Sequence, residues 1–152
     1  MPTNRSIAFS TQIVHIGSGA SLAAAALSGS ADVSTALVGS GNLARYDACD
    51  VAIMIAPTAS IAAASTIIEL YRRDLNVDGT NDEKIPDASN LQHFAGMFQI
   101  PAATTVSTTH YVQATNVQLS GGDCEFYIKN GLGVNIPAGW TLKVTPKTDS
   151  FA

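Results

Sequence analysis

The chain has few charged residues. Asp, Glu, Lys and Arg make up 13% of its 152 residues, which is about half of the roughly 25% that is usual in globular proteins. Alanine, serine, threonine and glycine fill the difference, and a surface of small residues loses little hydration when another protein covers it. The composition therefore favours a surface that packs against partner proteins, although an ordinary β-sandwich has a similar composition.

The chain also lacks a basic patch. Its net charge is −4, and its eight lysines and arginines are scattered, with Arg72-Arg73 as the largest run. Nucleic-acid binding needs a cluster of positive charges that neutralises several phosphates. We therefore expect no nucleic-acid partner.

Cysteine is scarce, and long apolar runs are missing. Cys49 and Cys124 show no metal-binding spacing, so we expect buried thiols, with a disulfide as the alternative in an oxidising compartment. The apolar run Leu22–Leu27 has six residues, whereas a membrane-spanning helix needs roughly 20. Residues 7–12 are too polar for the apolar part of a signal peptide. We expect synthesis in the cytoplasm, no export by the general pathway and no membrane partner.

No catalytic motif is evident either. The three histidines, His15, His93 and His110, lie outside any nucleophile motif of the Gly-x-Ser-x-Gly kind. Cys124 lies between two carboxylates, which would raise the pKa of its thiol and weaken it as a nucleophile. We therefore predict no catalytic residue and no enzymatic activity.

From Asp47 onward, apolar and polar residues mostly alternate. Short alternating segments lie at residues 49–56, 66–71, 93–100, 109–119, 125–129 and 140–145, with Pro, Gly or Asn between them. This period of two with frequent turn signals is typical of half-buried strands. The pattern predicts an all-β fold, a single β-sandwich or jelly-roll-like domain.

The N-terminal segment differs from the rest. Residues 18–42 are almost wholly Gly, Ser, Ala, Leu, Val and Thr. Leu22–Leu27 has the composition of one or two helical turns; alternatively, the segment is a low-charge arm that becomes ordered on a neighbouring subunit. We therefore divide the chain into an N-terminal arm or edge segment, residues 1–42, and a β-sandwich domain, residues 43–152.

One polar loop has the composition of a cation site. Residues 74–82 contain the order Asp-x-Asn-x-Asp-Gly, which resembles the first half of an EF-hand calcium loop. Ile85 stands where that loop has a bidentate Glu, and the alternative is a turn-rich loop without an ion. No other cofactor is expected. The ligands of a structural Ca²⁺ would be Asp74, Asn76, Asp78, the carbonyl of Thr80, and Asp82 through water.

Two aromatic residues suggest a second kind of site. Asn130-Gly131 is a hairpin-type turn signal, and a hairpin there would place Tyr127 and Trp140 on neighbouring strands. Two such rings could stack on a sugar. The alternative is that both belong to the core and rim of the sandwich.

Three segments resemble small virion proteins of tailed bacteriophages that are encoded near the major capsid protein. They are Glu69-Leu-Tyr-Arg-Arg-Asp-Leu-Asn-Val-Asp-Gly-Thr-Asn-Asp82, Asp123-Cys-Glu-Phe-Tyr-Ile-Lys-Asn130 and Ile136-Pro-Ala-Gly-Trp-Thr-Leu-Lys-Val-Thr-Pro146. The resemblance covers residues 69–148. It implies a capsid decoration, or cement, protein: a β-sandwich on the capsid surface of the virion that binds the major capsid protein and forms a homotrimer.

Two other functions stay open at this point. The same fold would suit a tail, neck or fibre component of a virion. A carbohydrate-binding β-sandwich module that uses Tyr127 and Trp140 is the alternative from another class. A gene for a major capsid protein immediately upstream would favour the decoration protein.

Overall fold

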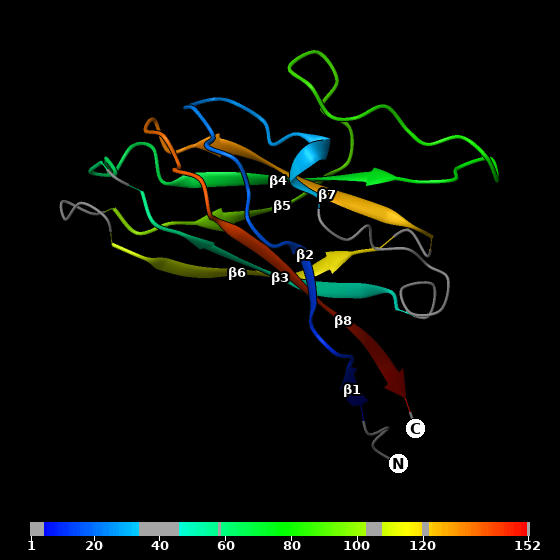
Figure 1. Cartoon of the computed structure of the whole chain (residues 1–152). Coiled ribbons are helices and arrows are strands. Elements are labelled where there is room, and N and C mark those ends of the chain that lie inside the picture. The colour runs from blue at the N-terminus through cyan, green and yellow to red at the C-terminus, as the bar shows by residue number, and fades with distance from the viewer. Residues whose placement is uncertain (1–4, 34–45, 58, 103–107, 120–121, 152) are drawn as a thin grey trace.

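The computed structural model describes residues 5–33, 46–57, 59–102, 108–119 and 122–151. Nearly all regular structure there is antiparallel β-sheet, arranged as two sheets (Figure 1). The prediction of an all-β sandwich is therefore confirmed. Within these residues the only helix is the three-residue 3-10 turn η1 (Ser30–Asp32), so no helix there has the length and apolarity to cross a membrane.

The first sheet is built around the last strand of the chain. β8 pairs with β3 along one side and with β1 and β2 along the other, and β3 also pairs with β6. Its strands are β1 (Arg5–Phe9), β2 (Ile13–Ile16), β3 (Ala48–Ile55), β6 (His110–Gln118) and β8 (Thr141–Phe151). The second sheet has the order β5 (Phe94–Gln99), β4 (Ile67–Asp74), β7 (Cys124–Gly131).

The core lies between these two sheets. Alternate side chains of β3 are fully buried, as the apolar alternation of that segment predicts, and they pack with buried side chains of β4, β7 and β8. The buried residues of these four strands include Cys49, Val51, Ile53, Ile55, Ile68, Leu70, Phe126, Ile128, Leu142 and Val144.

Part of the predicted N-terminal arm packs on this same chain. β1 and β2 belong to the first sheet, and residues 22–28 run along the outer edge of β7. The helical prediction for Leu22–Leu27 is wrong, because backbone groups of this stretch bond to β7 and to Ile136 instead, and Ala25 turns the chain with φ 62°. Tertiary pairing thus overrides the helix propensity of alanine. Residues 1–4 and 34–42 of the arm lie outside the described residues.

The last two strands do not form the predicted hairpin. β7 belongs to the second sheet and β8 to the first, and Asn130-Gly131 forms the end of β7. The buried Asn130 side chain donates to the backbone carbonyls of Leu22, Ala23 and Val134 and accepts from the N–H of Leu132. This asparagine therefore joins the N-terminal segment to the connection between the sheets.

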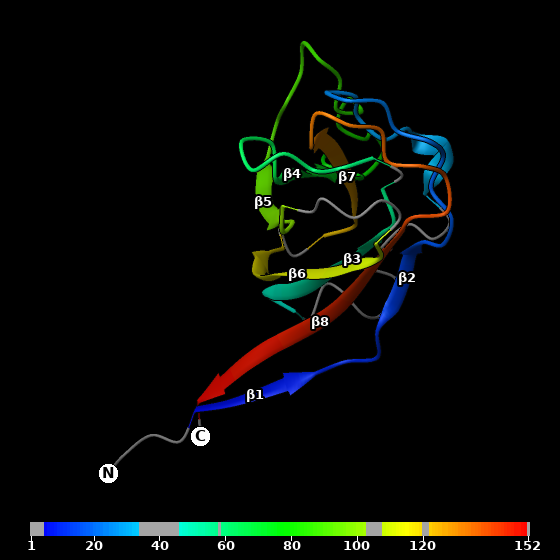
Figure 2. The same ribbon diagram turned by 90° about the vertical axis from the view of Figure 1, so that its left-hand side faces the viewer.

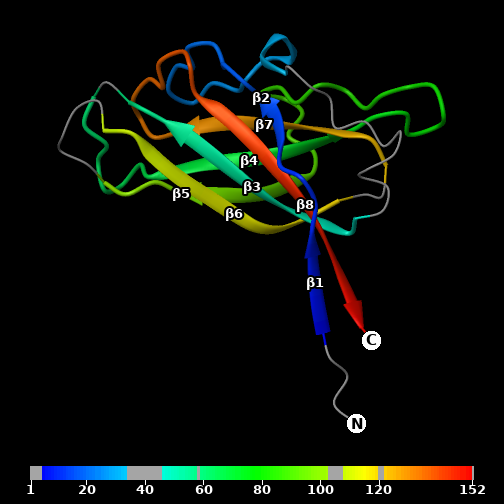
Figure 3. The same cartoon turned by 60° about the horizontal axis from the view of Figure 1, so that its bottom comes forward.

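A two-stranded ribbon projects from the sandwich. It consists of β1 and the C-terminal end of β8, and all three views show it extending away from the two sheets (Figures 1, 2 and 3). The register pairs Phe9 with Lys147 and Arg5 with Phe151, whereas β3 accompanies β8 only as far as the pair Ala48–Lys147. In the part of the chain that is described, the ribbon beyond Lys147 has no third strand beside it.

Gly19 permits a close contact with Trp140. The Gly19 N–H donates to the carbonyl of Trp140, whose indole N–H donates to the carbonyl of Ala20. A Cβ added at Gly19 would lie 2.0 Å from Cε2 of the indole ring. We expect Gly19→Ala to lower the free energy of unfolding by about 2 kcal/mol, because overpacked sites usually cost this much.

The matched control for this prediction is Gly29→Ala. There the nearest atom to an added Cβ is 3.9 Å away, so we expect a change within about 0.5 kcal/mol. Urea denaturation of both variants measures the difference. Equal losses at the two positions would contradict the packing described for Trp140.

Candidate functional site

In the loop between β4 and β5, carboxylates of the predicted calcium ligands bond to the loop itself. Asp78 accepts hydrogen bonds from the side chain and the backbone N–H of Asn81 and from the N–H of Thr80, and these bonds hold its pKa below the usual range. Asp82 accepts from the N–H of Asn76 and forms an ion pair with Arg73. These contacts are those of a turn-rich loop.

One of the predicted ligands belongs to a different cluster. Among the described residues, ligand atoms of three acidic or histidine side chains come within 4.8 Å of one another at one place, and these are Asp74, Glu83 and His93. Asn76, Asp78, Thr80 and Asp82 are not part of this group. A calcium site made of all five predicted residues stays a prediction.

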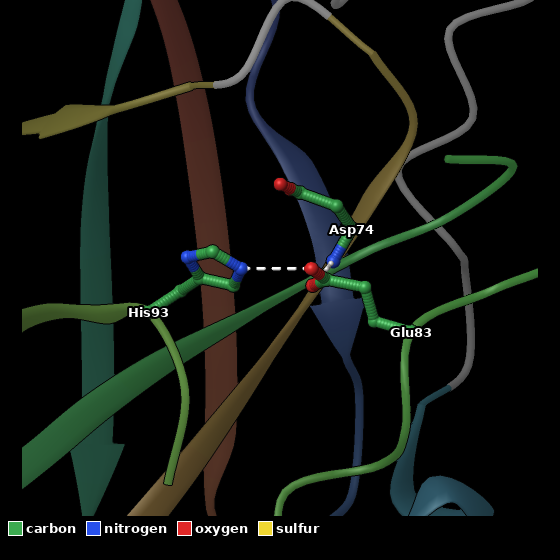
Figure 4. A group of neighbouring side chains, drawn as sticks. All are labelled: Asp74, Glu83 and His93. Carbon is green, nitrogen blue, oxygen red and sulfur yellow. Dashed lines mark hydrogen bonds and ion pairs between the residues drawn. The ribbon is translucent and has the colours of Figure 1, made fainter. Parts of the chain in front are cut away.

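The three side chains come from three segments that meet at one end of the second sheet (Figure 4). Asp74 ends β4, Glu83 lies in the loop that follows, and His93 immediately precedes β5. His93 has φ 48°, a left-handed conformation that is uncommon outside glycine. Its carbonyl accepts the N–H of Arg72, which fixes its backbone beside β4.

Glu83 links the other two members of the cluster. Its Oε2 accepts the backbone N–H of Asp74 at 2.9 Å, and its Oε1 lies 2.8 Å from Nε2 of His93. Because an ionised carboxylate only accepts hydrogen bonds, Nε2 of His93 donates in this contact. All three side chains are partly exposed, His93 most of all.

Two arginines surround the cluster. Arg72 donates to both carboxylate oxygens of Asp74, at 2.8 and 3.2 Å. Arg73 donates to the carbonyl of Glu83 and to the carboxylate of Glu125. Burial alone would lower the pKa of Arg73, but the hydrogen bond and charge of Glu125 outweigh it and raise that pKa. These guanidinium groups orient the acidic side chains at this end of the sheet.

The two predicted sugar-stacking rings are buried. Tyr127 and Trp140 are 0% and 1% exposed. The Tyr127 hydroxyl donates to Glu125, and burial together with this bond raises the pKa of Tyr127. Neither ring offers a face to a sugar. Tyr127 lies in β7 of the second sheet, whereas Trp140 immediately precedes β8 of the first sheet. The structure therefore does not support the aromatic sugar platform.

The exposed aromatic and large apolar side chains lie elsewhere. Ile7 and Phe9 on the ribbon are 49% and 61% exposed, and Phe94, Met97 and Tyr111 are exposed on β5 and β6. Simple alternation predicts Phe94 on the same buried face as Phe98. The register shift between β4 and β5 at Leu70 and Tyr71 turns it outward instead.

His15 and His110 lie in strands, outside the cluster of Asp74, Glu83 and His93. His15 is buried, and its Nε2 accepts the backbone N–H of Phe126, so it joins β2 to the opposite sheet. His110 begins β6 opposite Ile55.

Cys49 and Cys124 are free and fully buried. Burial raises the pKa of both thiols, that of Cys124 to about 12. We expect neither to react with iodoacetamide at neutral pH in the native protein and both to react after unfolding in urea, because the thiolate is the reactive form. Mass spectrometry counts the adducts, and rapid labelling of the native chain would contradict the burial of these side chains.

The fold and these clusters define an all-β sandwich with a projecting ribbon and a small acidic–histidine cluster beside one sheet. No protein-family model matches the chain, and no curated protein matches it significantly.

Proposed function

We propose that the chain is a structural protein of a tailed-phage virion, a capsid decoration protein that binds the lattice of the major capsid protein and stabilises the head. The observation that carries this proposal is the projecting ribbon with its exposed apolar side chains. Such a ribbon contributes nothing to the core of its own sandwich. Its exposed apolar side chains would be buried if the ribbon packed against another protein subunit.

The ribbon suits self-association. Ile7 and Phe9 are two positions apart on β1, so they share one face of the strand. Burying an isoleucine or phenylalanine side chain contributes roughly 1.5–3 kcal/mol. Three ribbons around a threefold axis would bury this face in a closed homotrimer.

The side of the sandwich formed by β5 and β6 would face the capsid. These strands are the outer strands of their sheets and lie next to each other (Figure 2). Phe94 and Met97 of β5 and Tyr111 of β6 are exposed. Large apolar side chains on open strand edges are typical of surfaces that another protein covers.

The mechanism would be thermodynamic. A protein that binds the assembled head and not the dissociated subunits stabilises the head by mass action, in proportion to the logarithm of its concentration above the dissociation constant. Low surface charge helps, because fewer charged groups lose hydration on binding. No catalytic step is required, and we propose none.

The experiment uses heads of the virus that carries this gene, prepared without the protein. Purified chain is added in increasing amounts, and binding is measured by co-sedimentation and the melting temperature of the heads by calorimetry. We expect saturable binding and a higher melting temperature at saturation. A folded, monodisperse protein that neither binds the heads nor raises their melting temperature would overturn the proposal.

A further inference from the structure

We propose that Asp74, Glu83 and His93 form a binding site for a divalent transition-metal ion of the Zn²⁺ type. This site is independent of the proposed role in assembly. It differs from the calcium loop that the sequence indicates, since it uses a histidine from the far end of the β4–β5 connection and leaves out Asp78 and Asp82.

The geometry needs little adjustment to hold such an ion. The ligand atoms of the three side chains lie within 4.8 Å of one another. Around a tetrahedral zinc, with bonds of about 2.0–2.2 Å, neighbouring ligand atoms are roughly 3.3–3.6 Å apart. Side-chain rotations would have to bring the three atoms together from their present separation.

The donor set decides between classes of metal. One imidazole nitrogen and two carboxylates are ligands that zinc and its neighbours accept. Calcium prefers six to eight oxygen ligands, and an imidazole nitrogen serves it poorly. The cluster therefore favours zinc over calcium.

Hydrogen bonds already orient the carboxylates of Glu83 and Asp74. Oε2 of Glu83 is held by the N–H of Asp74, which leaves Oε1 directed at His93 (Figure 4). Arg72 orients the Asp74 carboxylate in the same way. A carboxylate has about four lone-pair positions, so an arginine bond and a metal bond are compatible on one group. Proteins usually orient metal ligands by hydrogen bonds of this kind to the ligating side chains.

Metal binding would replace a proton. Nε2 of His93 now donates to Glu83 at 2.8 Å. An ion bound to this nitrogen would take the place of that proton, and a neutral imidazole would then carry its proton on Nδ1. The ion would also tie the β4–β5 loop to the ends of both strands.

Isothermal titration of the full, tag-free chain with ZnCl₂ tests the proposal. We expect one site per chain. His93→Asn and Glu83→Gln should each weaken zinc binding by at least about tenfold. Even the loss of a residue that only hydrogen-bonds to a metal ligand lowers metal affinity by about this factor. Asparagine suits the left-handed backbone at position 93, so this variant keeps the fold while it removes the imidazole. Asp78→Asn is the matched control, and we expect zinc to bind it as it binds the unaltered chain.

A parallel titration with CaCl₂ separates the two possible sites. The proposal predicts that calcium neither binds with comparable affinity nor displaces zinc. It is overturned if zinc gives no binding heat, or if His93→Asn binds zinc as tightly as the unaltered chain. It is also overturned if calcium is the tighter ligand and Asp78→Asn abolishes its binding, because the site would then be the loop.

Discussion

Replacing Ile7 and Phe9 together by serine is expected to dissociate the proposed homotrimer. Both side chains are exposed on the ribbon, so the change removes no contact from the core and the sandwich should keep its stability. Each buried isoleucine or phenylalanine contributes roughly 1.5–3 kcal/mol. Losing two in every contact between protomers weakens that contact by more than about a hundredfold.

Sedimentation velocity measures this effect, with Val77→Ser as the control. Val77 is 57% exposed, similar to the ribbon residues, but it lies in the loop between β4 and β5. We expect the control to sediment as the unaltered oligomer and the double variant as a monomer. A double variant that keeps the oligomeric mass would show that the ribbon is not the contact.

Lys147→Met is expected to lower the free energy of unfolding by about 3 kcal/mol, because breaking a buried ion pair leaves an uncompensated charge behind. The Lys147 ammonium donates to Oδ1 of Asp50, which also accepts the N–H of Asn116, and both members of the ion pair are buried. The pair also lies at the base of the ribbon, where Lys147 is opposite Phe9 on one side and Ala48 on the other. We therefore expect the variant to weaken self-association as well.

Lys84→Met is the control for the ion pair. Lys84 and Asp87 are paired at 2.7 Å, but their side chains are 63% and 44% exposed, so we expect a much smaller loss of stability than in Lys147→Met. Adding Asp50→Asn to Lys147→Met should restore part of the stability, since asparagine removes the charge and still accepts the Asn116 N–H. Urea denaturation measures all three variants. Equal losses in Lys147→Met and Lys84→Met would contradict the burial of the first pair.

The strands were predictable where local pattern and burial agree. In β3 the apolar residues at 49, 51, 53 and 55 alternate with Asp50, Ala52 and Met54, and the first set is fully buried. The errors arise where distant parts of the chain decide the outcome. The alanines at 23–26 pair with β7 instead of forming a helix, and Asn130 bonds to Leu22 and Ala23 instead of turning a hairpin. Such long-range bonds leave no periodic signal in the sequence.

The candidate metal cluster was predictable only in part. Asp74 begins a cation-like motif, so the sequence points to it. Its partners Glu83 and His93 become neighbours because β4 and β5 pair antiparallel and the loop folds back over their ends. A sequence reading that first paired the segments 66–71 and 93–100 would have placed His93 near Asp74. The motif at 74–82 instead favoured ligands that are close in sequence.

Electron microscopy of virions that carry a labelled copy tests most directly whether this protein covers a capsid. An epitope inserted at Ala63 lies in an exposed turn outside the ribbon, where insertions are tolerated best, and it can be marked with gold-conjugated antibody. We expect labels distributed evenly over the head. Labels confined to one vertex, the neck or the tail, or virions without label, would contradict it.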